Sequence, residues 1–252
     1  MVTGEAFEEA VAIARARPSL AVGLHLVLVS GRAALPAKEI PAISDAAGNF
    51  SSSPVRAGLR YEFNRRARAQ LRREILAQLE RFRETGLPLS HVDGHRHLHM
   101  HPVVIGILAE LAAAFSIPAV RLPSEELGAT LALDRSALAT KIVWSCLFRP
   151  LRQFGERRMR AAGVAFADRV YGLLGTGRIT EEYLLGLLPR IRSDRVELYA
   201  HPAAPFPGET LNGPPGSGPA ELEALVSARV SAAAAACGFR LSTYAGIGET
   251  SR

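Results

Sequence analysis

The sequence predicts an α/β protein built on a mostly parallel sheet or barrel. Two observations support this class: apolar runs of strand length alternate with amphipathic segments of helical period, and the runs are apolar almost throughout, as in strands covered on both faces. The chain has 252 residues, 48% of them hydrophobic and 21% charged, which is typical of a globular protein with a sizeable core. It shows neither an internal repeat nor a clear linker, so we expect one domain over 1–252.

The first predicted elements are a helix and a buried strand. Residues 5–16 place apolar side chains on one side at helical spacing, and Pro18 stops that helix. Residues 20–29 are apolar except for His25, which favours a strand covered on both faces. Residues 30–58 are rich in Gly, Pro, Ser and Ala, so we expect a long irregular segment of the kind that often borders an active site.

A charged helix and a further strand–helix–strand series follow. Residues 64–85 carry one apolar stripe, and Gly86 ends that helix. We expect a short strand at 89–93 and a helix over 102–115, which opens on a proline because the missing N–H costs nothing there. Residues 119–122 predict the next strand.

The second half continues the alternation around a basic helical insert. We expect helices over 135–163 and 180–192, the latter capped by Thr180, and a strand at 196–199 that leads into His201. The remaining expected elements are a Pro/Gly loop at 203–219, an Ala-rich helix at 220–237 and a last strand at 239–244.

Composition excludes several classes of protein. Cys146 and Cys237 lie far apart, which excludes a disulfide scaffold and a cysteine-based zinc finger. The first 18 residues contain acids and no apolar core, so we expect no secretory signal, and Glu110 interrupts the most apolar long stretch. The net charge of +6 permits anionic partners, but no nucleic-acid-binding motif is found. We therefore expect a cytoplasmic protein that does not bind nucleic acid.

Histidines carry the strongest functional signal. Five of the seven lie between positions 91 and 101, where a predicted strand ends and a helix begins, an edge at which parallel α/β folds build their sites. Neutral imidazole binds divalent metals, whereas packing, helix-capping or surface roles are the alternative. His25 and His201 belong to two other predicted strand ends, so three strands could each bring a histidine to one metal site completed by water.

Asp93 and Arg121 are the other candidate site residues. Asp93 could ligate a metal or orient a histidine, or it could form an Asp-Gly turn. Arg121 could contact substrate or pair with an acid. Two histidines, a carboxylate and water favour metal-assisted hydrolysis, in which the metal acidifies water and polarises an acyl carbonyl. The sequence has no G-x-S-x-G, P-loop or dinucleotide fingerprint, and a phosphoesterase would need more carboxylates.

Four segments occur in order that resemble one family: VGLHL at 22–26, HVDGHRHLHMHP at 91–102, AVRLP at 119–123 and YAHP at 199–202. The sequence resembles the YdjC family of carbohydrate deacetylases, which includes the chitooligosaccharide deacetylases, from residue 1 to about 244. This resemblance implies a distorted (β/α) barrel of the glycoside hydrolase/deacetylase type and one divalent metal ion, Mg or Zn. It also implies removal of the acetyl group from N-acetylglucosamine units.

The resemblance is greatest to the hopanoid-biosynthesis-associated branch, HpnK, through LHLVLVSGR, the basic insert and ADRVYGLLGTGRITEEYLLGLLPRI. That branch implies an N-acetylglucosaminyl hopanoid as substrate. By position the resemblance implies metal ligands at His25 and His95, an acid–base or substrate-contacting role beside the metal for His201, and a substrate pocket lined by His97, His99 and Arg121. We expect Asp93 to be catalytic together with His201.

One family feature is missing from the sequence. The family begins with a strand that ends in Asp-Asp-Phe-Gly, whose carboxylates supply a metal ligand and the general base, and this sequence matches only after it. We expect a barrel without its first strand, weak metal binding and impaired activity. A misassigned start is the explanation we favour. A degenerate, non-catalytic sugar- or lipid-binding copy, or replacement by Asp93 or by an acid of a partner chain, stays open.

The basic insert suggests a partner. Residues 141–160 mix Trp144 and Phe148 with six lysine or arginine side chains, as interfacial helices do. We expect either peripheral contact with the inner membrane or an aromatic face packed on the barrel. A homodimer is also open.

Overall fold

The structure, a computed structural model, describes residues 1–204 and 216–247. The chain divides into two compact units. The first unit comprises Met1–Leu122, Leu151–Phe166 and Thr243–Arg252, and the second comprises Pro123–Pro150 and Ala167–Ser242. Both contain helices and parallel strands, which confirms the α/β class. A single domain stays a prediction.

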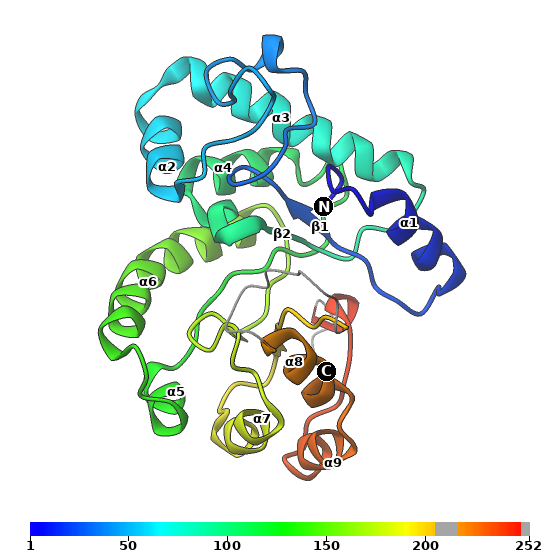
Figure 1. The fold of residues 1–252 in the computed structure, drawn as a ribbon, viewed down its shortest axis with the longest axis vertical. Coiled ribbons are helices and arrows are strands. Elements are labelled where there is room, and N and C mark those ends of the chain that lie inside the picture. The colour runs from blue at the N-terminus through cyan, green and yellow to red at the C-terminus, as the bar shows by residue number, and fades with distance from the viewer. Residues whose placement is uncertain (205–215, 248–252) are drawn as a thin grey trace. The chain divides into compact units, whose positions relative to one another are not determined.

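The first unit is built around one parallel strand pair. Its elements are α1 (Phe7–Ala16), β1 (Leu24–Leu26), η1 (Ala37–Glu39), α2 (Pro54–Phe63), α3 (Arg65–Glu84), β2 (Val92–Gly94), η2 (His95–Met100), α4 (Pro102–Leu111), the last part of α6 (Leu138–Ala161) and η4 (Tyr244–Ile247). The pairing of β1 with β2 sets His25 opposite Asp93. α3 packs on β1 and α4 (Figure 1). The strand expected at 119–122 is present only as isolated bridges from Val120 to Val92 and from Ala119 to Ala165.

Two buried polar side chains of α3 hold the segment after β1 in place. The amide of Gln78 bonds both the N–H and the carbonyl of Val27, at 3.0 and 2.8 Å. The carboxylate of Glu74 accepts the backbone N–H groups of Ala34 and Leu35. These contacts satisfy backbone groups that a buried loop would otherwise leave unpaired. These contacts fix the first residues of the segment 30–58, which was expected to be irregular. The last residues of that segment, from Pro54, belong to α2.

The second unit is a helical layer beside another parallel pair. Its elements are α5 (Leu127–Leu133), the first part of α6 (Leu138–Ala161), β3 (Arg169–Tyr171), α7 (Glu181–Leu187), η3 (Leu188–Arg190), β4 (Val196–Leu198), α8 (Ser217–Val226) and α9 (Ala228–Ala236). α7 packs against α5, α8 and α9. Its buried Leu184 and Leu187 join Tyr171 of β3 in one apolar core. Thr180 caps α7 through its side chain, as predicted.

Two expectations near the C-terminus are wrong. The helix expected at 220–237 is two helices, because the side chain of Ser227 accepts the N–H groups of Arg229 and Val230 and starts a new helix. Residues 239–243 form no strand: Leu241 is 83% exposed, and a 3-10 turn follows at Tyr244. The loop expected at 203–219 lies mostly outside the described residues.

A closed barrel is not shown by the described residues, whose named strands form two separate parallel pairs. The barrel, and with it the absence of its first strand, stays a prediction. Among the described helices, none combines the length and the apolar character needed to cross a membrane.

Candidate functional site

The site in the first unit begins with the register of β1 and β2. His25 and Asp93 face each other across the pair, and the His25 Nδ1–H donates to Asp93 Oδ1 at 2.7 Å. The guanidinium of Arg121 pairs with the other oxygen, Oδ2. Asp93 therefore lies in a strand and not in a turn, and it joins two candidate site residues.

Asp93 is held in its ionised form. Burial raises the pKa of Asp93, but the hydrogen bond from His25 and the charge of Arg121 outweigh it. The net result is a pKa well below the usual range of an aspartate. An ionised acceptor at Nδ1 fixes the tautomer of His25 and leaves Nε2 to bind a metal or a proton. The His25 side chain is 30% exposed, so a ligand can reach its ring.

His95 lies beside His25. The two ring centroids are 5.9 Å apart at an interplanar angle of 69°. The structure thus brings the two predicted metal ligands together. Imidazoles suit zinc and related divalent ions, and the Asp93 contact is the usual support for such a ligand. Among the described residues, however, no group of three histidine, cysteine or acidic side chains could hold a metal. The imidazole pair fits a metal, but a third protein ligand is missing from that part of the chain.

His99 and His97 are neutral at neutral pH. Burial lowers the pKa of His99 to about 4 and that of His97 to about 3. The His99 side chain is fully buried, and its Nε2 bonds the carbonyl of Arg121 at 2.8 Å. The N–H of Arg121 donates to Val92. His99 thus holds the backbone of Arg121, and its side chain has no exposed surface.

The backbone of η2 is strained where it carries these histidines. Arg96 and His97 both have left-handed conformations, with φ of 51° and 56°. Each such residue costs about 1–2 kcal/mol relative to the ordinary conformation. A Cβ at Gly94 would lie 2.9 Å from the Cβ of His99, so the glycine lets the chain fold back closely. The Arg96 side chain ties the turn to Ser30.

Two other histidines of the block have structural contacts. His101 caps α4, since its Nδ1 accepts the N–H of Val103 at 3.3 Å. The ring of His91 stacks on Tyr244, with centroids 4.4 Å apart. The helix-capping alternative therefore holds for His101.

His201 belongs to the second unit. Its backbone N–H donates to Glu221 Oε2 at 2.6 Å, and the other oxygen of Glu221 accepts the N–H of Ile179. Glu221 of α8 is almost fully buried. Sequence reasoning missed this positioning residue, for which the only signal was the pair of acids Glu221 and Glu223 in an Ala-rich segment. The other predicted site residues lie in the first unit: His25, Asp93, His95, His97, His99 and Arg121.

Comparison with known proteins places these residues in a family. The model of a family described as YdjC-like protein matches residues 1–236. The chain belongs to the YdjC-like family. This YdjC-like chain is 38% identical over 123 residues to a carbohydrate deacetylase of Brevibacillus brevis, covering 49% of the chain and 46% of that protein. It is 29% identical over 257 residues to a chitooligosaccharide deacetylase of Escherichia fergusonii, covering 97% and 84%.

The YdjC-like chain thus spans less than half the length of the Brevibacillus relative. Among solved structures, it is similar to a protein of Enterococcus faecalis described as a candidate cellobiose-phosphate cleavage protein. The TM-score is 0.73 at 23% identity, over 98% of this chain and 85% of the other. At that identity the likeness concerns the fold alone.

Proposed function

We propose that this YdjC-like protein is a carbohydrate deacetylase that hydrolyses the N-acetyl group of an N-acetylglucosamine unit. The observation that carries the proposal is the pair His25 and His95, with His25 oriented by a buried, ionised Asp93, on segments that the family match covers. The named activities of the bacterial relatives support the same chemistry.

We propose further that His25 and His95 hold one divalent metal ion, Mg or Zn. When bound, such an ion would polarise the acetyl carbonyl and acidify a water molecule. Asp93 accepts the Nδ1–H of His25 and so directs Nε2 outward, while Arg121 holds the second oxygen of Asp93. The remaining positions around the ion would be filled by water, substrate or an acid outside this pair.

The other predicted residues have distinct proposed tasks. His97, neutral at neutral pH, would bond a sugar or acetyl oxygen without a charge. His201, with its backbone fixed by Glu221, would move the proton to the leaving amine. For the finer substrate we propose a glycolipid of the hopanoid type, supported by the sequence segments that resemble that branch.

A second candidate function is binding of the sugar or lipid without catalysis. It is favoured by the lack of a three-ligand metal group in the part of the chain that the structure describes. A deacetylase with only two protein ligands would hold its metal weakly.

The test is acetate release by the full chain. Diacetylchitobiose and an N-acetylglucosaminyl lipid would be supplied to EDTA-treated protein with added Mg²⁺ or Zn²⁺. We expect weak, metal-dependent acetate release, lost in His25→Ala and retained in His91→Phe, which keeps the stack on Tyr244. Binding of the same sugars by calorimetry, with no acetate released under either metal, would overturn the deacetylase and support the binding protein.

A further inference from the structure

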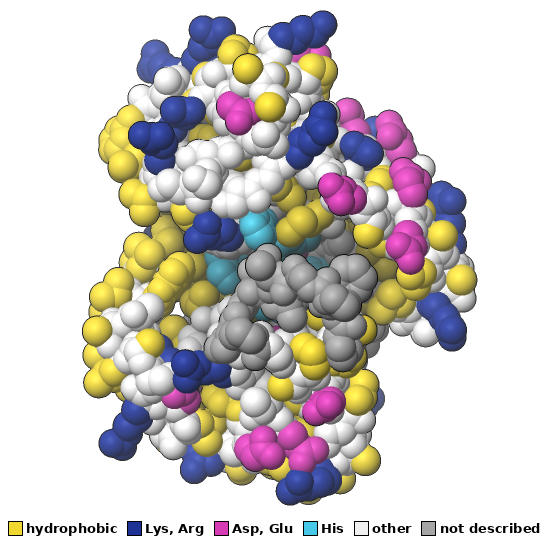
Figure 2. Space-filling view, viewed as in Figure 1, with side chains coloured by type: hydrophobic (Ala, Val, Ile, Leu, Met, Phe, Trp, Pro, Cys, Tyr) yellow, Lys and Arg dark blue, Asp and Glu magenta, His cyan; other side chains and the backbone are white. Residues whose placement is uncertain are grey.

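We propose that the first half of α6 is a docking surface for anionic lipid bilayers. This half carries large apolar side chains that face solvent, which we call the α6 apolar face. Its members and their exposed fractions are Leu138 at 45%, Ile142 at 42%, Val143 at 63%, Trp144 at 38% and Leu147 at 51%. In Figure 2 hydrophobic side chains gather on the left of the view, where α6 lies. Large apolar side chains gathered on one exposed helix are typical of a contact with another body.

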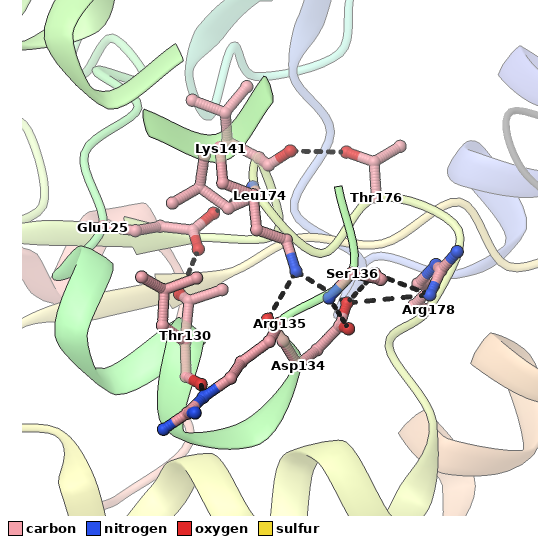
Figure 3. A network of polar contacts seen from close by, with 11 residues as sticks. Glu125, Thr130, Asp134, Arg135, Ser136, Lys141, Leu174, Thr176 and Arg178 are labelled. Carbon is pink, nitrogen blue, oxygen red and sulfur yellow. Dashed lines mark hydrogen bonds and ion pairs between the residues drawn. The ribbon is translucent and has the colours of Figure 1, made fainter. Parts of the chain in front are cut away.

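The first half of α6 is attached through two buried side chains, Lys141 and Phe148. Lys141 is only 4% exposed, and its Nζ donates to the carbonyl and to Oδ2 of Asp134, both at 2.7 Å. Ser136 and Arg178 surround the same aspartate (Figure 3). A helix on a globular protein normally buries its apolar stripe and exposes its lysines. Here one of the two anchoring residues is a lysine, and the other large apolar side chains of this half face outward.

Trp144 has a fixed place on this face. Its ring stacks on that of Phe148, with centroids 5.3 Å apart and an interplanar angle of 29°, and Phe148 is buried. Tryptophan has an apolar body and an N–H donor, which suits the boundary between lipid tails and headgroups. A tryptophan held half-exposed on an apolar face is therefore an interfacial anchor.

The charges around the α6 apolar face indicate which kind of partner docks there. Residues 135–155 contain no aspartate or glutamate, and Arg135 and Arg149 are exposed there. A second copy docked on the same face would bring like charges together without an acid to pair them. Anionic headgroups supply the missing negative charge. An anionic lipid surface therefore fits this face better than a second copy of the chain.

The first test uses the unaltered full chain. Trp144 is the only tryptophan, so intrinsic fluorescence reports on the α6 apolar face alone. Vesicles of phosphatidylcholine with phosphatidylglycerol should shift its emission to the blue, and brominated acyl chains should quench it. Pure phosphatidylcholine should give a weaker response, and added salt should reduce binding. Absence of any shift with anionic vesicles would overturn the proposal.

The second test uses variants that keep the reporter. Val143→Ser/Leu147→Ser should reduce partitioning onto anionic vesicles at least about tenfold, because two exposed apolar side chains are removed. The matched control is Val55→Ser/Leu59→Ser on α2, where the side chains are 72% and 56% exposed. An equal loss in both variants would contradict the assignment to α6.

A different occupant would give a different signature. A blue shift without vesicles that rises with protein concentration, accompanied by a doubled mass in sedimentation, would assign the face to a second copy and overturn the lipid proposal. No sugar enters these measurements, so their failure leaves the proposed deacetylase activity untouched.

Discussion

Asp93 and Asp134 each form an ion pair with a basic side chain, but their other hydrogen-bond partners differ. Asp93 lies in β2, and one of its two partners is the imidazole of His25. Asp134 lies just before α6, where its partners include Lys141 and Ser136. The histidine has a second ring nitrogen that can act on a ligand, whereas the lysine only donates to the protein. The same kind of ion pair thus orients a histidine with a free ring nitrogen at Asp93 and anchors a helix at Asp134.

The largest expected effect tests whether the imidazole of His25 is what distinguishes the Asp93 ion pair from the Asp134 ion pair. His25→Ala should lower kcat/KM for acetate release by more than about 100-fold, since it removes a proposed metal ligand and not its support. Thermal unfolding of the variant is the control and should show a folded protein. Full activity with unchanged metal affinity would place the chemistry elsewhere.

Next in size is the effect of Asp93 on its histidine. Asp93→Asn should reduce activity and metal affinity about 10–100-fold, because outer partners of metal ligands contribute about that much. Calorimetric titration with Zn²⁺ and steady-state rates measure both. An activity loss without any change in metal affinity would mean that Asp93 acts on substrate directly.

Asp134 should behave in the opposite way. Asp134→Ala leaves the buried ammonium of Lys141 without its carboxylate and should lower the free energy of unfolding by about 1–3 kcal/mol. Activity at a temperature where the variant is folded should stay within about twofold, since the pair only anchors α6. Urea denaturation and the acetate assay check the two parts. A large loss of activity in a folded variant would erase the distinction between the two aspartates.

The smallest expected effect is the loss at low pH of the stability that Asp134 contributes. Burial raises the pKa of Asp134, but its bonds with Lys141 and Ser136 outweigh this and lower the pKa to about 2. The pKa of an aspartate in the unfolded chain is about 3.9. The contribution of ionised Asp134 to the free energy of unfolding is therefore complete above that pH and is lost as the pH falls toward about 2. The difference in urea midpoint between the wild type and Asp134→Asn should therefore shrink from pH 5 to pH 3. A difference in urea midpoint that does not change with pH would show that the charge of Asp134 does not stabilise the folded protein.

Local signals predicted the long helices well. The apolar stripe of α3, the opening proline of α4 and the Thr180 cap act within a few residues, so sequence alone places them. The split at Ser227 was missed because a serine inside an Ala-rich run is also tolerated in a helix. The strand expected over 20–29 is only three residues long, since ladder length depends on a partner far away in sequence.

The candidate site was predictable in composition but not in the role of each residue. Histidine spacing and the flanking strands indicated that His25, His95 and Asp93 would lie close together, and they do. The burial of His99 and its bond to Arg121 depend on a contact 22 residues away. The hydrogen bond from the His201 N–H to Glu221 likewise joins residues 20 positions apart. Periodicity contains no information about such contacts.

The left-handed backbone at His97 has an evolutionary consequence. Glycine would adopt the same φ at no steric cost, so selection for stability alone favours losing the imidazole at this position. A library screened only for thermal tolerance should accumulate glycine at 97, whereas a library screened for turnover should keep histidine. Under the proposed function, the backbone strain at His97 is tolerated because turnover depends on the imidazole ring.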